Sequence, residues 1–148
     1  MTEIKGFFGP WRFMSNFHYV NVEWQGLTYR TTEHAYQAAK FENVEYRKYI
    51  QGLYHPREAR TAGQAEGCNP DWDNLKYDVM YDLNAQKYSY PKLMEMLLDS
   101  ENAYLEETNH WKDVYWGVCS GVGQNNLGKI LMDIRSQLQN ITGRQFTG

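Results

Sequence analysis

Hydrophobic and polar residues alternate in the first part of the chain. The apolar positions recur at every second residue on both sides of a short polar interruption: Val20, Val22 and Trp24, then Leu27 and Tyr29. A period of two is typical of a half-buried strand. The interruption, Gln25-Gly26, is suited to a tight turn. We therefore predict a few short strands within residues 4–30, with a small antiparallel sheet.

Beyond Thr31 the apolar spacing becomes helical. Thr32 is suited to cap a helix whose first residue is Glu33. Further helices have start or stop signals at Asn43 and Gly52, at Pro56 and Gly63, at Asp71 or Asp73, and at Pro91. The last predicted helix has the apolar row Leu127, Ile130, Leu131, Ile134 and Leu138. The pattern predicts a mainly α-helical (α+β) domain with a small N-terminal antiparallel sheet.

Length and charge narrow the classes of function. The chain has 148 residues and no visible repeat or linker, so we expect a single domain over residues 1–148. An aromatic share of 16% excludes a disordered chain. A net charge of −3 argues against a basic surface that grips duplex nucleic acid through many phosphates. It is compatible with a pocket for one nucleotide.

The sequence gives no signal for a membrane or for a metal. It has no apolar run of about 18 residues, and its first residues lack the pattern of a signal peptide. Cys68 and Cys119 belong to no CxxC pair, and the four histidines form no HExxH-like array. We therefore expect a cytoplasmic protein with reduced cysteines, no metal site and no membrane partner.

Three polar residues share one face of the predicted first helix. Glu33, Gln37 and Lys40 are spaced i, i+4 and i+7, among small alanines. Such a stripe is most often a solvated surface. The alternative is a pocket wall with a carboxylate and an amine two turns apart. Burial would then lower the pKa of the lysine and make its amine usable as a nucleophile or a base.

A second candidate region mixes acidic side chains with tryptophans. Its members are Glu106, Glu107, Trp111, Asp113 and Trp116. One interpretation is that the tryptophans stack on a purine or nicotinamide ring, a contact worth about 1–3 kcal/mol per base. The other is that the tryptophans are core anchors and the acids are capping or surface residues. The sequence leaves both interpretations open.

A glycine-rich segment, residues 121–128, precedes the last predicted helix. The amides of such a loop and the N-terminal end of the helix can hold an anion such as phosphate. The segment is neither GxGxxG nor a Walker A loop, and turn or cap formation by Asn125 and Asn126 is the more common explanation. Cys119, just before it, lacks the residues that surround catalytic cysteines, so we expect a small buried side chain there.

Short motifs follow one another in a characteristic order between about residue 13 and about residue 135. They are Phe13-Met14-Ser15-Asn16-Phe17, Thr32-Glu33-His34 with Tyr36-Gln37 and Lys40-Phe41, Asp71-Trp72-Asp73 with Val79-Met80 and Lys87-Tyr88, Leu105 with Glu107, Asp113 with Trp116-Gly117, and Gly123 with Asn125, Leu127-Gly128, Leu131-Met132 and Ile134-Arg135. In this combination they resemble the NADAR family, also called YbiA-like.

The resemblance implies a YbiA-like fold and an N-glycosidase that cleaves bonds between ribose C1 and a nitrogen, without a metal or redox cofactor. It implies two substrate classes. One is ADP-ribose attached to guanine, in a nucleotide or in ADP-ribosylated DNA or RNA. The other is a ribosylamino-pyrimidine intermediate of riboflavin biosynthesis.

The functional positions of the family are carried over as Glu33, Lys40, Trp72, Asp113 and Asn125, with Asn16, Glu107, Trp116, Gly117 and Gly128 as further pocket members. Residues 108–112 form a longer stretch than in some members. Either Glu106 or Glu107 could therefore occupy the family's glutamate position. We assign Glu107 to it because of its spacing from Leu105.

Two chemical routes remain open. A carboxylate, from Glu33 or Asp113, is suited to stabilise an oxocarbenium-like transition state. Alternatively, the neutral amine of Lys40 attacks C1 of an opened ribose and forms a Schiff base that water resolves. The resemblance favours the lysine route, with Glu33 transferring protons. It implies that Asp113 orients ribose hydroxyls, that Trp72 or Trp116 stacks on a ring, and that Asn125 with nearby amides binds phosphate or hydroxyls. A module that only binds NAD or ADP-ribose is the third hypothesis.

Overall fold

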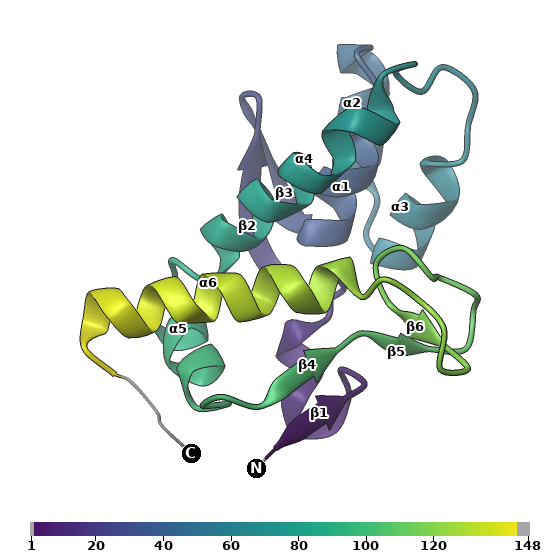
Figure 1. Cartoon of the computed structure of the whole chain (residues 1–148). Helices are drawn as coiled ribbons and strands as arrows, with labels where there is room; N and C mark the ends of the chain where they lie inside the picture. Colours follow the sequence, from purple (N-terminus) through teal and green to yellow (C-terminus); the bar gives the residue numbers. More distant parts are fainter. Residues whose placement is uncertain (1, 145–148) are drawn as a thin grey trace. The chain divides into compact units, whose positions relative to one another are not determined.

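A computed structural model of the chain describes residues 2–144 (Figure 1). The chain forms two compact units. One consists of residues 16–87, and the other combines the residues up to Ser15 with those from Tyr88 onward. Among the described residues, no helix is both long and apolar enough to cross a membrane.

The unit of residues 16–87 begins with an antiparallel hairpin of β2 (Tyr19–Trp24) and β3 (Leu27–Thr31) (Figure 1). The turn residues Gln25 and Gly26 have φ values of 46° and 90°. Two consecutive positive values are the signature of a type I′ turn, whose twist matches that of the strands. The predicted N-terminal antiparallel sheet is confirmed.

The helix α1 (Thr32–Ala39) follows β3 without a loop, and all of its residues are buried. Besides the two strands, three helices pack around it: α2 (Val44–Gly52), α3 (Pro56–Ala62) and α4 (Trp72–Lys87). Ala35 and Ala38 are fully buried. Their small side chains allow the neighbouring elements to approach α1 closely.

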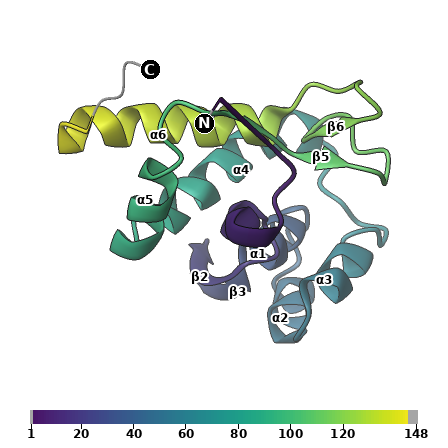
Figure 2. The same cartoon turned by 90° about the horizontal axis from the view of Figure 1, so that it is seen from below.

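Among its described residues, the other unit contains two pairs of short parallel strands, one 3-10 helix and two α-helices. Its elements are β1 (Glu3–Lys5) paired with β4 (Tyr104–Glu106), β5 (Thr108–Asn109) paired with β6 (Val118–Cys119), a 3-10 helix (Gly9–Met14), α5 (Pro91–Leu98) and α6 (Asn126–Thr142). α6 packs against α5 and β4 (Figure 2). Its buried face carries Leu127, Ile130, Leu131 and Ile134, as the apolar row predicts.

Most helix ends agree with the signals in the sequence. Asn43 caps α2, while Pro56 and Pro91 begin α3 and α5. The first helix begins one residue earlier than predicted. Its cap is Thr31, the last residue of β3, whose hydroxyl accepts a hydrogen bond from the amide of His34.

Two features of the second unit differ from the prediction. The prediction places a few short strands within residues 4–30 and no helix there, but Gly9–Met14 forms a 3-10 helix with proline in its first turn. The parallel pairs are also absent from the prediction. The paired strands are far apart in the sequence; Ile4, for example, pairs with Leu105. The periodicity within one segment does not show which distant segment it pairs with.

Candidate active site

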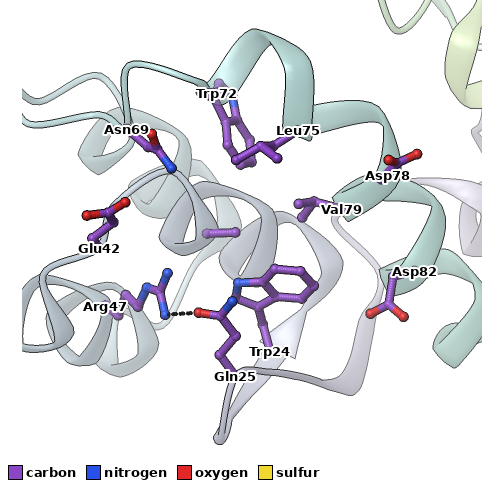
Figure 3. A pocket seen from close by; sticks show the side chains of 11 residues that line it. Trp24, Gln25, Glu42, Arg47, Asn69, Trp72, Leu75, Asp78, Val79 and Asp82 are labelled. Atoms are coloured by element: carbon purple, nitrogen blue, oxygen red, sulfur yellow. Dashed lines mark hydrogen bonds between the residues drawn. The ribbon is translucent and has the colours of Figure 1, made fainter.

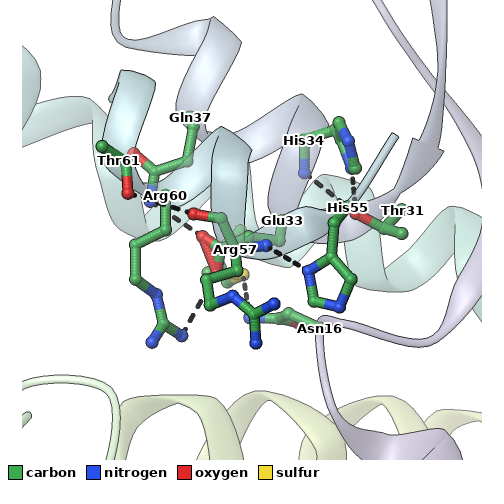
Figure 4. Close-up of polar contacts among 10 residues, drawn as sticks. Asn16, Thr31, Glu33, His34, Gln37, His55, Arg57, Arg60 and Thr61 are labelled. Atoms are coloured by element: carbon green, nitrogen blue, oxygen red, sulfur yellow. Dashed lines mark hydrogen bonds and ion pairs between the residues drawn. The ribbon is translucent and has the colours of Figure 1, made fainter. Parts of the chain in front are cut away.

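The carboxylate of Glu33 is buried inside the unit of residues 16–87. Glu33 and Gln37 are each 6% exposed, because two strands and three helices pack around α1. Nε2 of Gln37 donates to Oε2 of Glu33 at 2.8 Å, and Nη2 of Arg60 lies 3.8 Å from Oε1 (Figure 4). The interpretation of these positions as a solvated stripe is therefore wrong. They form a buried polar cluster.

Asn16 lies beside Glu33, as its assignment to the same pocket requires. The backbone amide of Glu33 donates to the carbonyl oxygen of Asn16 at 3.1 Å. Nδ2 of the Asn16 side chain is 3.5 Å from Sδ of Met80. Its Oδ1 is buried and has no hydrogen-bond partner among the described residues. A buried polar atom without a partner is costly.

Lys40 caps the C-terminal end of α1 and is half-buried. Its Nζ lies 3.5 Å from the carbonyl oxygen of Gly63 and 5.8 Å from the centroid of the Tyr36 ring. Burial lowers the pKa of Lys40 from its usual value of 10.5, against the opposing effect of the Glu33 charge. More of its amine is therefore neutral near pH 7 than in an exposed lysine, which nucleophilic attack requires.

Trp72, the first residue of α4, is connected to Lys40 through one aromatic side chain. Its ring centroid is 5.2 Å from that of Tyr36, whose ring also faces the Lys40 ammonium group. Trp72 is buried, and it contributes one wall of a neighbouring hollow (Figure 3). The structure thus brings four predicted site residues into one unit: Asn16, Glu33, Lys40 and Trp72.

The remaining predicted site residues belong to the other unit. Asp113 stabilises a turn there, because its Oδ1 accepts hydrogen bonds from the amides of Tyr115 and Trp116 at 3.2 and 2.9 Å. Asn109 holds the same turn from the other side. It accepts from the amide of Asp113 and donates to its carbonyl oxygen. Asp113 therefore caps a turn in this unit. Capping is one of the two roles that the sequence leaves open for the acidic residues of this segment.

Asn125 is buried at the start of α6 and has a left-handed backbone, with a φ of 55°. Its Oδ1 accepts from the amide of Glu107 at 3.0 Å, and its Nδ2 donates to the carbonyl oxygen of Leu105 at 2.9 Å and the hydroxyl of Tyr104 at 3.2 Å. The side chain therefore fastens α6 to the β4 segment.

Four amides that precede and begin α6 are engaged in backbone hydrogen bonds. Those of residues 124–127 donate to the backbone carbonyl oxygens of residues 114–117 at 2.8 to 3.2 Å. These four donors already have backbone acceptors, and the phosphate site at Asn125 and nearby amides stays a prediction.

Gly117 and Gly128 allow two close backbone approaches. A Cβ at Gly117 would lie 2.1 Å from the carbonyl oxygen of Glu107, and a Cβ at Gly128 would lie 2.2 Å from that of Leu105. Both contacts are far shorter than real Cβ contacts. Packing alone thus requires glycine at both positions, whether or not a substrate lies near them.

The acidic and aromatic residues of this segment differ in environment. Glu106 is buried, and its carboxylate accepts from the hydroxyls of Thr108 and Tyr104 at 2.6 and 3.2 Å, whereas Glu107 is half-buried. Trp116 is half-buried, and Trp111 is 47% exposed, so Trp111 is not a core anchor.

Cys119 differs from its prediction as well. It is half-buried rather than buried, because it ends β6 and leads into an exposed turn at residues 120–121. Cys119 and Cys68 are both free thiols. Within residues 2–144, no group of three or more histidine, cysteine or acidic side chains is placed to hold a metal ion.

Two members of the Glu33 cluster are absent from the predicted site residues. Gln37 has a signal in the sequence, its i+4 spacing from Glu33. Arg60 has none, because it reaches Glu33 from α3. Only the packing of two helices identifies it as a partner of the buried carboxylate.

Comparison with known proteins identifies relatives over most of the chain. Residues 2–139 match the model of the NADAR domain. N-glycosidase YbiA of Escherichia coli (strain K12) is 34% identical over 128 residues, which cover 84% of this chain and 79% of that protein. The chloroplastic riboflavin biosynthesis protein PYRR of Zea mays is 37% identical over 126 residues, which are 76% of this chain and 20% of that protein.

A solved structure is similar over the whole chain. The NMR structure of the E. coli protein YbiA has a TM-score of 0.83 and 30% sequence identity, and the match covers 99% of this chain and 92% of that one. The fold is therefore the α+β fold of YbiA. The chain belongs to the NADAR family. It spans most of YbiA but about a fifth of the maize relative.

Proposed function

We propose that this protein is an N-glycosidase, a hydrolase that cleaves the bond between C1 of a ribose and a nitrogen. One observation carries the proposal: α1 carries the buried carboxylate of Glu33, and its C-terminal cap Lys40 has a half-buried amine of lowered pKa. The name of the bacterial relative, N-glycosidase YbiA, supports the same class of reaction. A module that only binds NAD or ADP-ribose has no need of a neutral amine.

The proposed reaction proceeds through a lysine Schiff base. The lone pair of the glycosidic nitrogen expels the ring oxygen, which takes up a proton, and leaves an iminium at C1. The amine of Lys40 adds to C1, and a proton moves from Lys40 to the glycosidic nitrogen. The C1–N bond then breaks and the base leaves as an amine. Water adds to the Schiff base and releases the sugar and the lysine.

Glu33 is the proposed proton-transfer group. Its carboxylate is held by Gln37 and Arg60, so its orientation is fixed before a substrate binds. A positioned carboxylate can accept the proton from Lys40 and deliver it to the leaving nitrogen. In the alternative route the same carboxylate stabilises an oxocarbenium-like transition state directly, and Lys40 does not become covalently attached.

The first proposed substrate is ADP-ribose linked to guanine, in a nucleotide or in single-stranded DNA or RNA. A net charge of −3 disfavours an extended grip on duplex phosphates and favours contact limited to one nucleotide. The second candidate is a ribosylamino-pyrimidine intermediate of riboflavin biosynthesis, which the name of the maize relative favours. Both present a ribose C1–N bond to the same pair of groups.

The residues of the other unit enter the proposal in two ways. Asp113, Glu107 and Trp116 remain candidates for substrate contact. We assign Gly117, Asn125 and Gly128 to shaping the segment that carries them, since each is explained by contacts within that unit.

Borohydride trapping tests the lysine route. The protein is incubated with ADP-ribosyl-guanosine or with the ribosylamino-pyrimidine, borohydride is added, and peptides are analysed by mass spectrometry. We expect the reduced sugar to be attached to Lys40. Release of free ADP-ribose or of the pyrimidine, followed by chromatography, identifies the substrate. Binding of the substrate without release of a product would contradict the proposed enzymatic activity and favour a module that only binds its ligand.

Lys40→Met is the matching variant, and Lys48→Met at an exposed position of α2 is its control. Lys40→Met is expected to abolish trapping and reduce turnover by orders of magnitude while the circular dichroism spectrum is unchanged. Lys48→Met should behave as the unmodified protein. Full turnover without an adduct would exclude the Schiff base. Near-normal turnover of Lys40→Met would transfer the role to another lysine, with the fully buried Lys87 tested next.

A further inference from the structure

A hollow of about 510 Å³ opens on the unit of residues 16–87, beside the candidate active site (Figure 3). It is lined by the β2–β3 turn, the end of α1, α2 and one face of α4. Trp72 belongs to its lining, whereas neither Glu33 nor Lys40 does. A volume of this size suits a ligand with the bulk of a nucleoside.

Two indole rings contribute to the walls of this hollow. Trp24 ends β2 and Trp72 begins α4, and Figure 3 shows them at separate places on its lining, with Leu75 and Val79 also part of it. Flat apolar walls favour a flat aromatic ligand, because stacking of a base on an aromatic side chain is worth about 1–3 kcal/mol. A small ammonium group held by the same rings would leave most of the volume unfilled.

The rim carries more acidic than basic side chains. Three carboxylates, of Glu42, Asp78 and Asp82, face one guanidinium, that of Arg47. The guanidinium is already engaged, since it donates to Oε1 of Gln25 at 2.6 Å and to a backbone carbonyl oxygen. The excess of negative charge repels phosphate and favours a neutral or positively charged ligand.

Hydrogen-bonding groups of both kinds lie around the apolar walls. Nε1 of Trp24 is buried and has no acceptor among the described residues. Oδ1 of Asn69 accepts from the amide of Asp71, and Figure 3 shows the amide nitrogen of Asn69 directed toward the hollow. The amide nitrogen of Asn69 and the rim carboxylates match a heterocycle that has ring-nitrogen acceptors and exocyclic amino donors.

We propose that this hollow is a second binding site, for a flat nitrogen heterocycle without phosphate: an aminopurine or aminopyrimidine base or its nucleoside. The ring packs against the indoles of Trp24 and Trp72 that line the hollow, and its amino group donates to a rim carboxylate. The site shares Trp72 with the candidate active site but requires none of the proposed catalytic chemistry.

Nuclear magnetic resonance of the full chain, labelled with 15N, tests this proposal with adenosine as the probe. The indole N–H signal of Trp24 is identified by its loss in Trp24→Phe. We expect the signals of Trp24 and Trp72 to shift and saturate together, while the side-chain amide signal of Gln37 stays in place. AMP carries the same base with an added phosphate, and should bind at least about tenfold more weakly.

Two variants of α4 separate the rim charge from general effects. Asp78→Asn removes a rim carboxylate and should narrow the difference in affinity between adenosine and AMP several-fold. Asp73→Asn removes the same charge from an exposed position of α4 outside the hollow and should leave that difference unchanged.

Several results would overturn the proposal. They are no shift at millimolar adenosine, shifts confined to Gln37, equal binding of AMP, or larger shifts of the same signals with choline. Because the readout is binding rather than turnover, the result is independent of the proposed glycosidase activity.

Discussion

The guanidinium of Arg60 on α3 lies 3.8 Å from the carboxylate of Glu33 on α1. The carboxylate also accepts from Gln37, one turn along the same helix. Its burial is thus compensated by a cation and an amide that come from its own unit. Glu33 is therefore held in a defined orientation in the absence of a substrate.

Removing this cation is expected to destabilise the protein. Arg60→Gln should lower the free energy of unfolding by about 1 kcal/mol at neutral pH, because a buried carboxylate loses its ionic partner. The loss is limited because the Arg60 side chain is 42% exposed. Urea denaturation gives the value, with Arg57→Gln on the same helix as control. Equal unfolding free energies of the Arg60→Gln and Arg57→Gln variants would show that the Arg60–Glu33 ion pair does not stabilise the fold.

Replacing Lys40 by arginine separates charge from nucleophilicity. Lys40→Arg retains a positive charge but cannot supply a neutral amine, so kcat/KM should fall about 1,000-fold or more. Steady-state kinetics on whichever substrate the protein turns over gives the result. The substrate Kd should change far less than kcat. Retention of full activity would favour the carboxylate route, in which the lysine needs only its charge.

The rate should rise with pH on the acidic side of its optimum. Burial lowers the pKa of Lys40 below 10.5, so the neutral fraction of its amine grows as pH increases and levels off before that of an exposed lysine. A profile of kcat/KM between about pH 6 and pH 10 checks this expectation. In the Lys40→Arg variant this ascending limb should disappear from whatever activity remains.

The close approach at Gly128 predicts a large effect of one methyl group. Gly128→Ala should lose about 3 kcal/mol of unfolding free energy, because the new Cβ would meet the backbone oxygen of Leu105 at 2.2 Å. Gly52→Ala is the matched control. Its Cβ would meet nothing within 4 Å, and a gain of about 0.5 kcal/mol is expected there. Thermal or urea unfolding of both variants decides the matter.

His34 predicts a loss of stability in mild acid. Its ring is fully buried, Nε2 donates to the carbonyl oxygen of Leu53 at 2.9 Å, and Nδ1 therefore accepts from the hydroxyl of Thr31 at 2.6 Å. Burial lowers the pKa of His34 from 6.5. The unfolded chain then binds a proton more readily than the folded one, so stability declines as pH falls from 6.5 toward the lowered pKa.

The unfolding free energy of His34→Gln should depend less on pH across this range. His110 is exposed, so His110→Gln should keep the slope of the unmodified protein. An identical slope in all three proteins would show that the acid sensitivity arises elsewhere.

Local chemistry explains which elements were predictable. The start of α2 was found because Asn43 accepts from the amide of Tyr46, a contact within four consecutive residues. The hairpin was found because Gln25-Gly26 supplies the turn between two alternating stretches. In each case the residues that decide the structure are neighbours in the chain.

Tertiary contacts explain the failures. The stripe at Glu33 and Gln37 has the spacing of a solvated face, and its burial depends on helices that approach from elsewhere. The glycine-rich segment has the composition of an anion cradle, which does not show that residues 114–117 supply acceptors for four of its amides. The family resemblance predicted Glu33 and Lys40 as site residues. Arg60 was not predicted, because its contact with Glu33 depends on the packing of α3 against α1.

The absence of a loop between β3 and α1 carries one last consequence. Thr31 is both the final residue of β3 and the N-terminal cap of α1. The register of the hairpin therefore determines how α1 is rotated about its own axis. Inserting one residue between Thr31 and Thr32 would turn every later side chain of α1 by about 100°. Length variation in this family should accordingly avoid that junction and accumulate at the hairpin tip.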